Sequence, residues 1–173
     1  MNNMLRKKRH PLLFFANVCI FALVIIFQTS EIADISIYNA SPMLILPLLT
    51  AFSFFSALKQ CVIAGLICGA FIDSVSQGAY CFNTIILMLL SVFVYLAAND
   101  LFNKNIRAAM VLSLITAAIY YILLWVFFYC IGAEMQNNLG FLLKYALPSA
   151  AYSAVFIIPF YYLYRYFKKL KEH

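Results

Sequence analysis

The feature that most constrains this chain is a series of apolar segments, each close to the length that crosses a bilayer. A membrane-spanning helix needs about 20 mostly apolar residues. Six such segments follow one another, separated by short polar stretches, at residues 11–28, 42–58, 61–74, 82–98, 106–131 and 141–164. The sequence therefore predicts an all-α integral membrane protein with six transmembrane helices, forming a single polytopic domain over residues 1–173.

Two of these segments need a separate argument. Lys59 and Gln60 interrupt the apolar run between the second and third segments, and a lysine is costly at mid-bilayer but not at a surface turn. We therefore interpret this region as two helices. The first segment follows a basic start but is longer than the apolar core of a signal peptide, so we expect it to remain as an uncleaved first span.

The composition excludes a water-soluble domain, because 66% of the residues are hydrophobic and 10% are charged. The charge distribution predicts orientation, since cytoplasmic loops of membrane proteins are enriched in Lys and Arg. With both termini in the cytoplasm, eleven of the twelve basic residues lie at cytoplasmic ends, and only Lys144 lies near the outside. The basic clusters at residues 6–9 and 165–171 suit contact with membrane lipids. Nucleic-acid binding is not expected, because no polar domain is present.

Neither metal nor catalytic chemistry is predicted. Most of the five cysteines lie inside apolar runs without CxxC spacing, so we expect small hydrophobic side chains rather than disulfides. His10 and His173 lie in basic tails and do not form a metal site. No catalytic motif or phosphate-binding loop occurs, so neither an enzyme nor a cofactor is expected. An intramembrane enzyme would need a second buried ionisable group besides Asp73.

Aromatic residues are abundant near the predicted span ends, and we expect most of them to be interfacial anchors. They are Tyr120, Tyr121, Trp125, Tyr129, Tyr161, Tyr162, Tyr164 and Tyr166.

One polar residue stands at the end of the third segment. Gly65, Gly69 and Asp73 are spaced four residues apart and therefore share one helix face. The two glycines form a smooth strip that lets a neighbouring helix approach closely. For Asp73 three interpretations are open. In the first, it is an interfacial acid at the helix end. In the second, it lies between helices and accepts hydrogen bonds from the turn (Ser76 or the Gly78 N–H) or from a partner. In the third, it belongs to a proton or ion path.

The same residues carry a resemblance to a known family. The pattern G-x-x-x-G-x-x-x-D-x-x-S, then a glycine turn, then Asn-Thr, resembles the rod shape-determining protein family MreD. The matching residues are Gly65, Gly69, Asp73, Ser76, Gly78, Asn83 and Thr84, with Pro42 opening the second span. The segments 101–104, 121–129 and 147–152 also resemble the family, so the likeness covers nearly the whole chain. The family often has glycine four and eight residues after the aspartate, where this chain has Gln77 and Cys81.

This resemblance implies a fold similar to the substrate-binding S-components of energy-coupling-factor transporters. It implies a non-catalytic subunit of the bacterial elongation complex in the cell membrane, supporting lateral peptidoglycan synthesis and cell shape. The implied partners are MreC and, through it, MreB, RodA and a class B penicillin-binding transpeptidase. The Gly65/Gly69 strip and the Asp73–Gly78 turn would set the geometry that the partner reads.

The alternative is the substrate-binding S-component of an energy-coupling-factor vitamin transporter. Such a protein needs polar side chains that converge from the outer loops. The outer loops offer Asp73, Gln77, Asn83, Glu134, Gln136 and Asn137.

Overall fold

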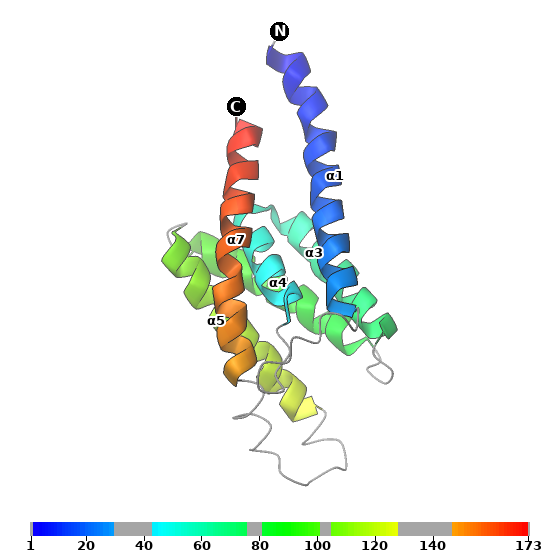
Figure 1. Cartoon of the computed structure of the whole chain (residues 1–173), viewed down its shortest axis with the longest axis vertical. Helices are drawn as coiled ribbons and strands as arrows, with labels where there is room; N and C mark the ends of the chain where they lie inside the picture. The colour runs from blue at the N-terminus through cyan, green and yellow to red at the C-terminus, as the bar shows by residue number, and fades with distance from the viewer. Residues whose placement is uncertain (1, 30–42, 76–80, 101–104, 128–146, 173) are drawn as a thin grey trace.

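The computed structural model (Figure 1) describes residues 2–29, 43–75, 81–100, 105–127 and 147–172, and its described elements are all helices. They are α1 (Asn2–Thr29), α2 (Ile45–Phe55), α3 (Leu58–Val75), α4 (Phe82–Asp100), α5 (Ile106–Trp125) and α7 (Leu147–Glu172). The predicted all-α class is therefore confirmed for the described part of the chain.

Among the described residues, three helices are long and apolar enough to cross a membrane: Leu58–Val75, the Phe82–Asn99 part of α4, and Ile106–Trp125. Large apolar side chains also cover the outside of these helices, including Ile63, Leu89 and Val111, which are 56%, 56% and 49% exposed. Such an apolar outer surface is stable against lipid and not against water. The chain is therefore a helical membrane protein.

Helix α2 lies at the centre of the bundle, where it contacts α1, α3, α4, α5 and α7. Residues 45–54 are all buried, which is typical of a helix that is apolar all round. Its 11 residues extend over about 16 Å, roughly half the thickness of the hydrocarbon core. The described helix is thus shorter than the predicted segment 42–58, and Pro42 lies outside the described residues.

The break between α2 and α3 falls at Ser56 and Ala57, before the predicted Lys59–Gln60 interruption. Lys59 and Gln60 belong to the first turn of α3. The Gln60 side chain accepts a hydrogen bond from the Ala57 N–H (3.4 Å), and the Ala57 carbonyl accepts from the Gln60 and Cys61 N–H groups (2.9 and 3.1 Å). Gln60 therefore forms the glutamine half of a capping box, which favours a helix start here.

The core has two connected parts, both built around α2. In one part Leu46 and Leu49 pack with Leu87, Leu90 and other side chains of α4 and α5. In the other, Phe52 and Phe54 pack against the buried rings of Tyr164 and Tyr161 of α7, with ring centroids 5.5 and 6.1 Å apart. Helix α2 therefore holds together helices that are distant in sequence.

The chain termini lie at the same end of the molecule, where α1 and α7 project beyond the other helices (Figure 1). These helices have 28 and 26 residues, so each is about 40 Å long, longer than the hydrocarbon core. Both basic clusters belong to these projecting parts. The predicted number of spans and the side on which the termini lie remain predictions.

Candidate functional site

The carboxylate of Asp73 accepts four hydrogen bonds from the start of α4. One oxygen accepts from the backbone N–H (3.1 Å) and the side-chain amide (3.0 Å) of Asn83. The other accepts from the backbone N–H (2.8 Å) and the hydroxyl (2.5 Å) of Thr84. Of the three interpretations of Asp73, the contacts match the one in which it accepts hydrogen bonds between helices. The donors are Asn83 and Thr84, whereas Ser76 and Gly78 lie outside the described residues.

The first backbone N–H groups of a helix have no partner within the helix and are normally satisfied by the side chain of the N-cap residue. At the start of α4 the N-cap position is Cys81, whose carbonyl accepts a hydrogen bond from the Ile85 N–H (3.1 Å). A thiol is a weak capping group. Asp73 takes over this role from the end of α3, and its negative charge is favourable beside the positive end of the α4 dipole.

Cys81 has a φ of 53°, in the left-handed region that L-residues rarely adopt. No other non-glycine residue in the described part of the chain has a positive φ. Glycine would adopt this backbone conformation without strain.

The network continues from Asn83 into α5. The Tyr120 hydroxyl donates a hydrogen bond to the Asn83 Oδ1 atom (2.7 Å), and Tyr120 is only 3% exposed. Asn83 is thus bonded on its amide nitrogen by Asp73 and on its oxygen by Tyr120. One chain of polar contacts therefore connects α3, α4 and α5 at the end of the bundle opposite the termini.

The glycine strip brings the two helices close enough for these contacts. A Cβ atom on Gly65 would lie 2.7 Å from the Met88 Cα and 2.8 Å from the Leu87 carbonyl oxygen. A Cβ on Gly69 would collide with the Thr84 Cα and lie 2.7 Å from the Asn83 carbonyl oxygen. The strip therefore packs against α4 of the same chain. Gly69 contacts the backbone of Asn83 and Thr84, the two residues whose N–H groups Asp73 caps.

A second polar contact joins α3 and α4 at a distance from the Asp73 junction. The Ser91 hydroxyl, on α4, lies 2.9 Å from the Cys61 carbonyl oxygen on α3 and 2.7 Å from the Met88 carbonyl oxygen of its own helix. Both Ser91 and Cys61 are buried.

The structure describes only some of the predicted site residues. It brings together Gly65, Gly69, Asp73 and Asn83, whereas Pro42, Ser76 and Gly78 lie outside the described residues. Of the polar residues that a vitamin site would use, Asp73 and Asn83 are bonded to each other. The remaining four, Gln77, Glu134, Gln136 and Asn137, lie outside the described residues.

The role of Tyr120 was not predicted; it is one of eight aromatic residues of which most were expected to be interfacial anchors. Three of the eight are not surface anchors: Tyr120, Tyr161 and Tyr164 are 3%, 1% and 3% exposed and pack in the core. Their neighbours Tyr162 and Tyr166 are 56% and 60% exposed, which suits an interfacial role. The spacing along α7 distinguishes the buried from the exposed tyrosines, because residues 161 and 164 share one face of the helix and residues 162 and 166 lie on another.

The arrangement holds helices in place. Both Asp73 oxygens are occupied by donors of α4, and within the described residues no group of three or more His, Cys, Asp or Glu side chains could hold a metal ion. No protein-family model, curated protein or solved structure gives a significant match to the chain. Its function is therefore inferred from its residues and their geometry.

Proposed function

We propose that the protein is a non-catalytic, six-span subunit of the bacterial elongation complex, of the kind that its resemblance to the MreD family implies. It lies in the bacterial cell membrane with both termini in the cytoplasm, associates with MreC, and supports lateral peptidoglycan synthesis and cell shape. MreB, RodA and a class B penicillin-binding transpeptidase belong to the same assembly.

The observation that carries this proposal is the Asp73 junction. The described residues of the family-like pattern that flank the turn lie along one contact between α3 and α4. Asp73 bonds Asn83 and Thr84, Gly69 packs against the backbone of these two residues, and Gly65 packs one turn farther along α4, against Leu87 and Met88. The pattern thus corresponds to one continuous structure, whose polar atoms are directed at each other. Such a junction would fix the relative positions of two helices that present a surface to a membrane partner.

The test is an affinity purification of the tagged full chain from its native membrane in mild detergent, followed by mass spectrometry. We expect recovery of MreC together with the elongation synthases. A second, tagged polytopic membrane protein of the same cells serves as the control for unspecific capture. Recovery of an ATPase pair with a coupling membrane subunit, and no MreC, would contradict the proposal and assign the chain to a vitamin transporter.

A further inference from the structure

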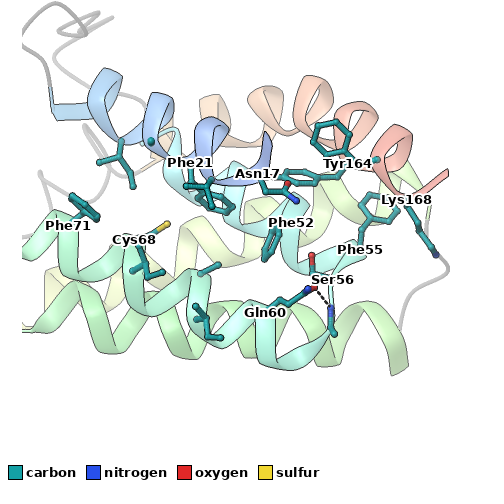
Figure 2. Close-up of a pocket in the computed structure, with 18 of the residues that line it drawn as sticks. Asn17, Phe21, Phe52, Phe55, Ser56, Gln60, Cys68, Phe71, Tyr164 and Lys168 are labelled. Carbon is teal, nitrogen blue, oxygen red and sulfur yellow. Dashed lines mark hydrogen bonds between the residues drawn. The ribbon is translucent and has the colours of Figure 1, made fainter. Parts of the chain in front are cut away.

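A cavity of about 570 Å³ lies on the opposite side of α3 from the Asp73 junction, between α1, α3 and the last turns of α7 (Figure 2). The side chains of Phe52 and Phe55 of α2 form part of its wall. Its volume is in the range of sites that bind small molecules, about 300–1,000 Å³. None of the residues of the Asp73 junction lines it, so the cavity is separate from the site described above.

The cavity is lined mainly by apolar side chains, and it opens toward the outer surface of the bundle. Its outer rim includes Val18 of α1 and Ile63 and Phe71 of α3, which are 48%, 56% and 51% exposed. These side chains belong to the surface that faces lipid in a helical membrane protein. A molecule can therefore enter the cavity laterally from the bilayer, between α1 and α3.

The polar residues of the lining are not spread evenly. Phe71 lies at one end of the cavity, whereas Ser56, Gln60 and Lys168 lie at the other (Figure 2). The polar end is the end of the bundle at which both termini lie (Figure 1). The cavity therefore has the polarity of an amphiphile, with an apolar length and one polar end.

Two polar atoms of the lining residues are buried without a hydrogen-bond partner within the described structure. They are the Tyr164 hydroxyl and the Asn17 Oδ1 atom. A buried polar atom without a partner is unfavourable, and such atoms in folded proteins commonly mark a missing ligand, water or ion. A polar group of an occupant that reaches these atoms would give both side chains a partner.

The charge at the polar end is positive. Lys168 lines the cavity, Arg165 lies one turn before it on α7, and none of the described lining residues is acidic. This charge favours an anionic headgroup.

We propose that this cavity binds one anionic glycerophospholipid of the surrounding bilayer. An acyl chain lies between α1 and α3, and the phosphate is held near Lys168, Gln60 and Tyr164. This inference does not depend on the proposed function, because it uses neither the family-like residues nor a protein partner.

The test is native mass spectrometry of the purified full chain in detergent, titrated with phosphatidylglycerol and separately with phosphatidylcholine. We expect one molecule of phosphatidylglycerol to bind in preference to phosphatidylcholine. Ala22 is an exposed lining residue and Leu23 is an exposed neighbour outside the lining. Ala22→Trp fills the cavity and should weaken binding by about tenfold or more, whereas Leu23→Trp should leave it unchanged.

The headgroup is tested with a second matched pair. Lys168→Gln should remove most of the preference for phosphatidylglycerol, whereas Lys169→Gln, at the exposed neighbouring position, should keep it. Tyr164→Phe should weaken phosphatidylglycerol binding without lowering the thermal stability of the lipid-free protein, because the hydroxyl has no partner there.

Equal binding by the Ala22→Trp and Leu23→Trp variants would overturn the proposed site. Equal affinity for the two phospholipids, or displacement of phosphatidylglycerol by equimolar polyprenyl phosphate, would overturn the assignment of the ligand. If Ala22→Trp fails to fold, Ile67→Trp with Leu66→Trp as its control makes the same comparison on α3, since only Ile67 lines the cavity.

Discussion

The carboxylate of Asp73 accepts hydrogen bonds from the two backbone N–H groups of α4 that an N-cap side chain would normally satisfy, those of Asn83 and Thr84. In water, a missing cap is partly replaced by solvent. In a membrane protein these N–H groups have fewer alternative partners, so a cap supplied by another helix also determines how the two helices are positioned. An acid that would be unfavourable at the end of α3 is thus favoured by the start of α4.

Replacing Asp73 by alanine removes all four of these contacts. We expect Asp73→Ala to lower the free energy of unfolding by about 2 kcal/mol, the range for a charged cap of a partly exposed helix end. Unfolding of the purified protein by a denaturing detergent, followed by tryptophan fluorescence or circular dichroism, measures this change. Ser74→Ala is the control, because the Ser74 hydroxyl is exposed and contacts only the Phe71 carbonyl among the described residues. A loss no larger than that of the control would contradict the role of Asp73.

Cys81 offers a prediction of opposite sign. Its φ of 53° is unfavourable for an L-residue, and its side chain is exposed, so little packing is lost on removing it. We expect Cys81→Gly to stabilise the protein by about 1 kcal/mol and Cys81→Val to destabilise it, because a β-branched residue tolerates this conformation least. Thermal melting of the two variants beside the parent chain is the measurement. A lower melting temperature for the glycine variant would show that the left-handed conformation is not the controlling factor.

At the scale of helices, α3 and α4 form the most extensive helix pair of the described structure. Small residues permit the close approach, and polar contacts at Asp73 and Ser91 fasten the pair in two places. Close packing and interhelical hydrogen bonds are the main sources of helix association in a bilayer, because lipid tails are as apolar as the side chains. The pair is therefore held by both close packing and hydrogen bonds.

The strip of small residues is tested by adding bulk to it. We expect Gly69→Leu to destabilise the protein by about 3 kcal/mol or to prevent folding, because its side chain would collide with the backbone of Asn83 and Thr84. Gly65→Leu should have a similar effect against Met88. Ala70→Leu, at an exposed position beside Gly69, should leave stability nearly unchanged. The yield of monodisperse protein and its melting temperature compare the variants.

If the pair presents the partner surface, as proposed, both glycine variants should also lose MreC in the affinity purification, while Ala70→Leu keeps it. Recovery of MreC at the normal level with a folded Gly65→Leu and Gly69→Leu protein would show that the strip is not needed for assembly.

The connection to α5 is weaker and should be coupled to Asp73. Tyr120→Phe removes the hydroxyl that bonds Asn83 and is expected to cost about 1 kcal/mol. Because Asn83 is shared, the Asp73→Ala and Tyr120→Phe changes should not be additive. A double-mutant cycle on the free energy of unfolding checks this. Strict additivity would mean that the two contacts are independent and that no network joins the three helices.

At the scale of the whole molecule, the central feature is the buried helix α2. The burial of residues 45–54 explains how a helix of 11 residues fits among longer ones, since it is surrounded by protein and does not need to match the bilayer thickness. It contacts α7 at its Phe52–Phe54 end and α4 and α5 along its length. The polar pair Thr50–Thr116, with hydroxyl oxygens 3.2 Å apart, fastens α2 to α5 in this core.

The proposed orientation is a property of the whole chain. Reporter fusions of alkaline phosphatase and green fluorescent protein to each terminus distinguish the two sides of the membrane. We expect both termini to be fluorescent and without phosphatase activity, because the basic clusters at residues 6–9 and 165–171 resist translocation. Phosphatase activity at one terminus only would mean an odd number of spans and would contradict the six-span topology.

Much of the architecture follows from hydropathy and spacing. The helical class and the membrane environment follow from composition, because a chain with 66% hydrophobic and 10% charged residues can expose its surface only to lipid. The four-residue spacing of Gly65, Gly69 and Asp73 identified one face of α3, since this periodicity is a local property of any helix. The position of the break before Lys59 was not predicted, because it depends on a single side-chain cap by Gln60.

The remaining features required the positions of helices relative to each other. Spacing along a helix shows which residues share a face, but not which other helix that face meets. The partner of Asp73, the burial of Tyr120, Tyr161 and Tyr164, and the cavity beside α1 all depend on contacts between residues distant in the sequence. Such contacts arise from the packing of whole helices, in which the same apolar side chain is equally stable against lipid or protein. Only the tertiary arrangement selects between these two environments.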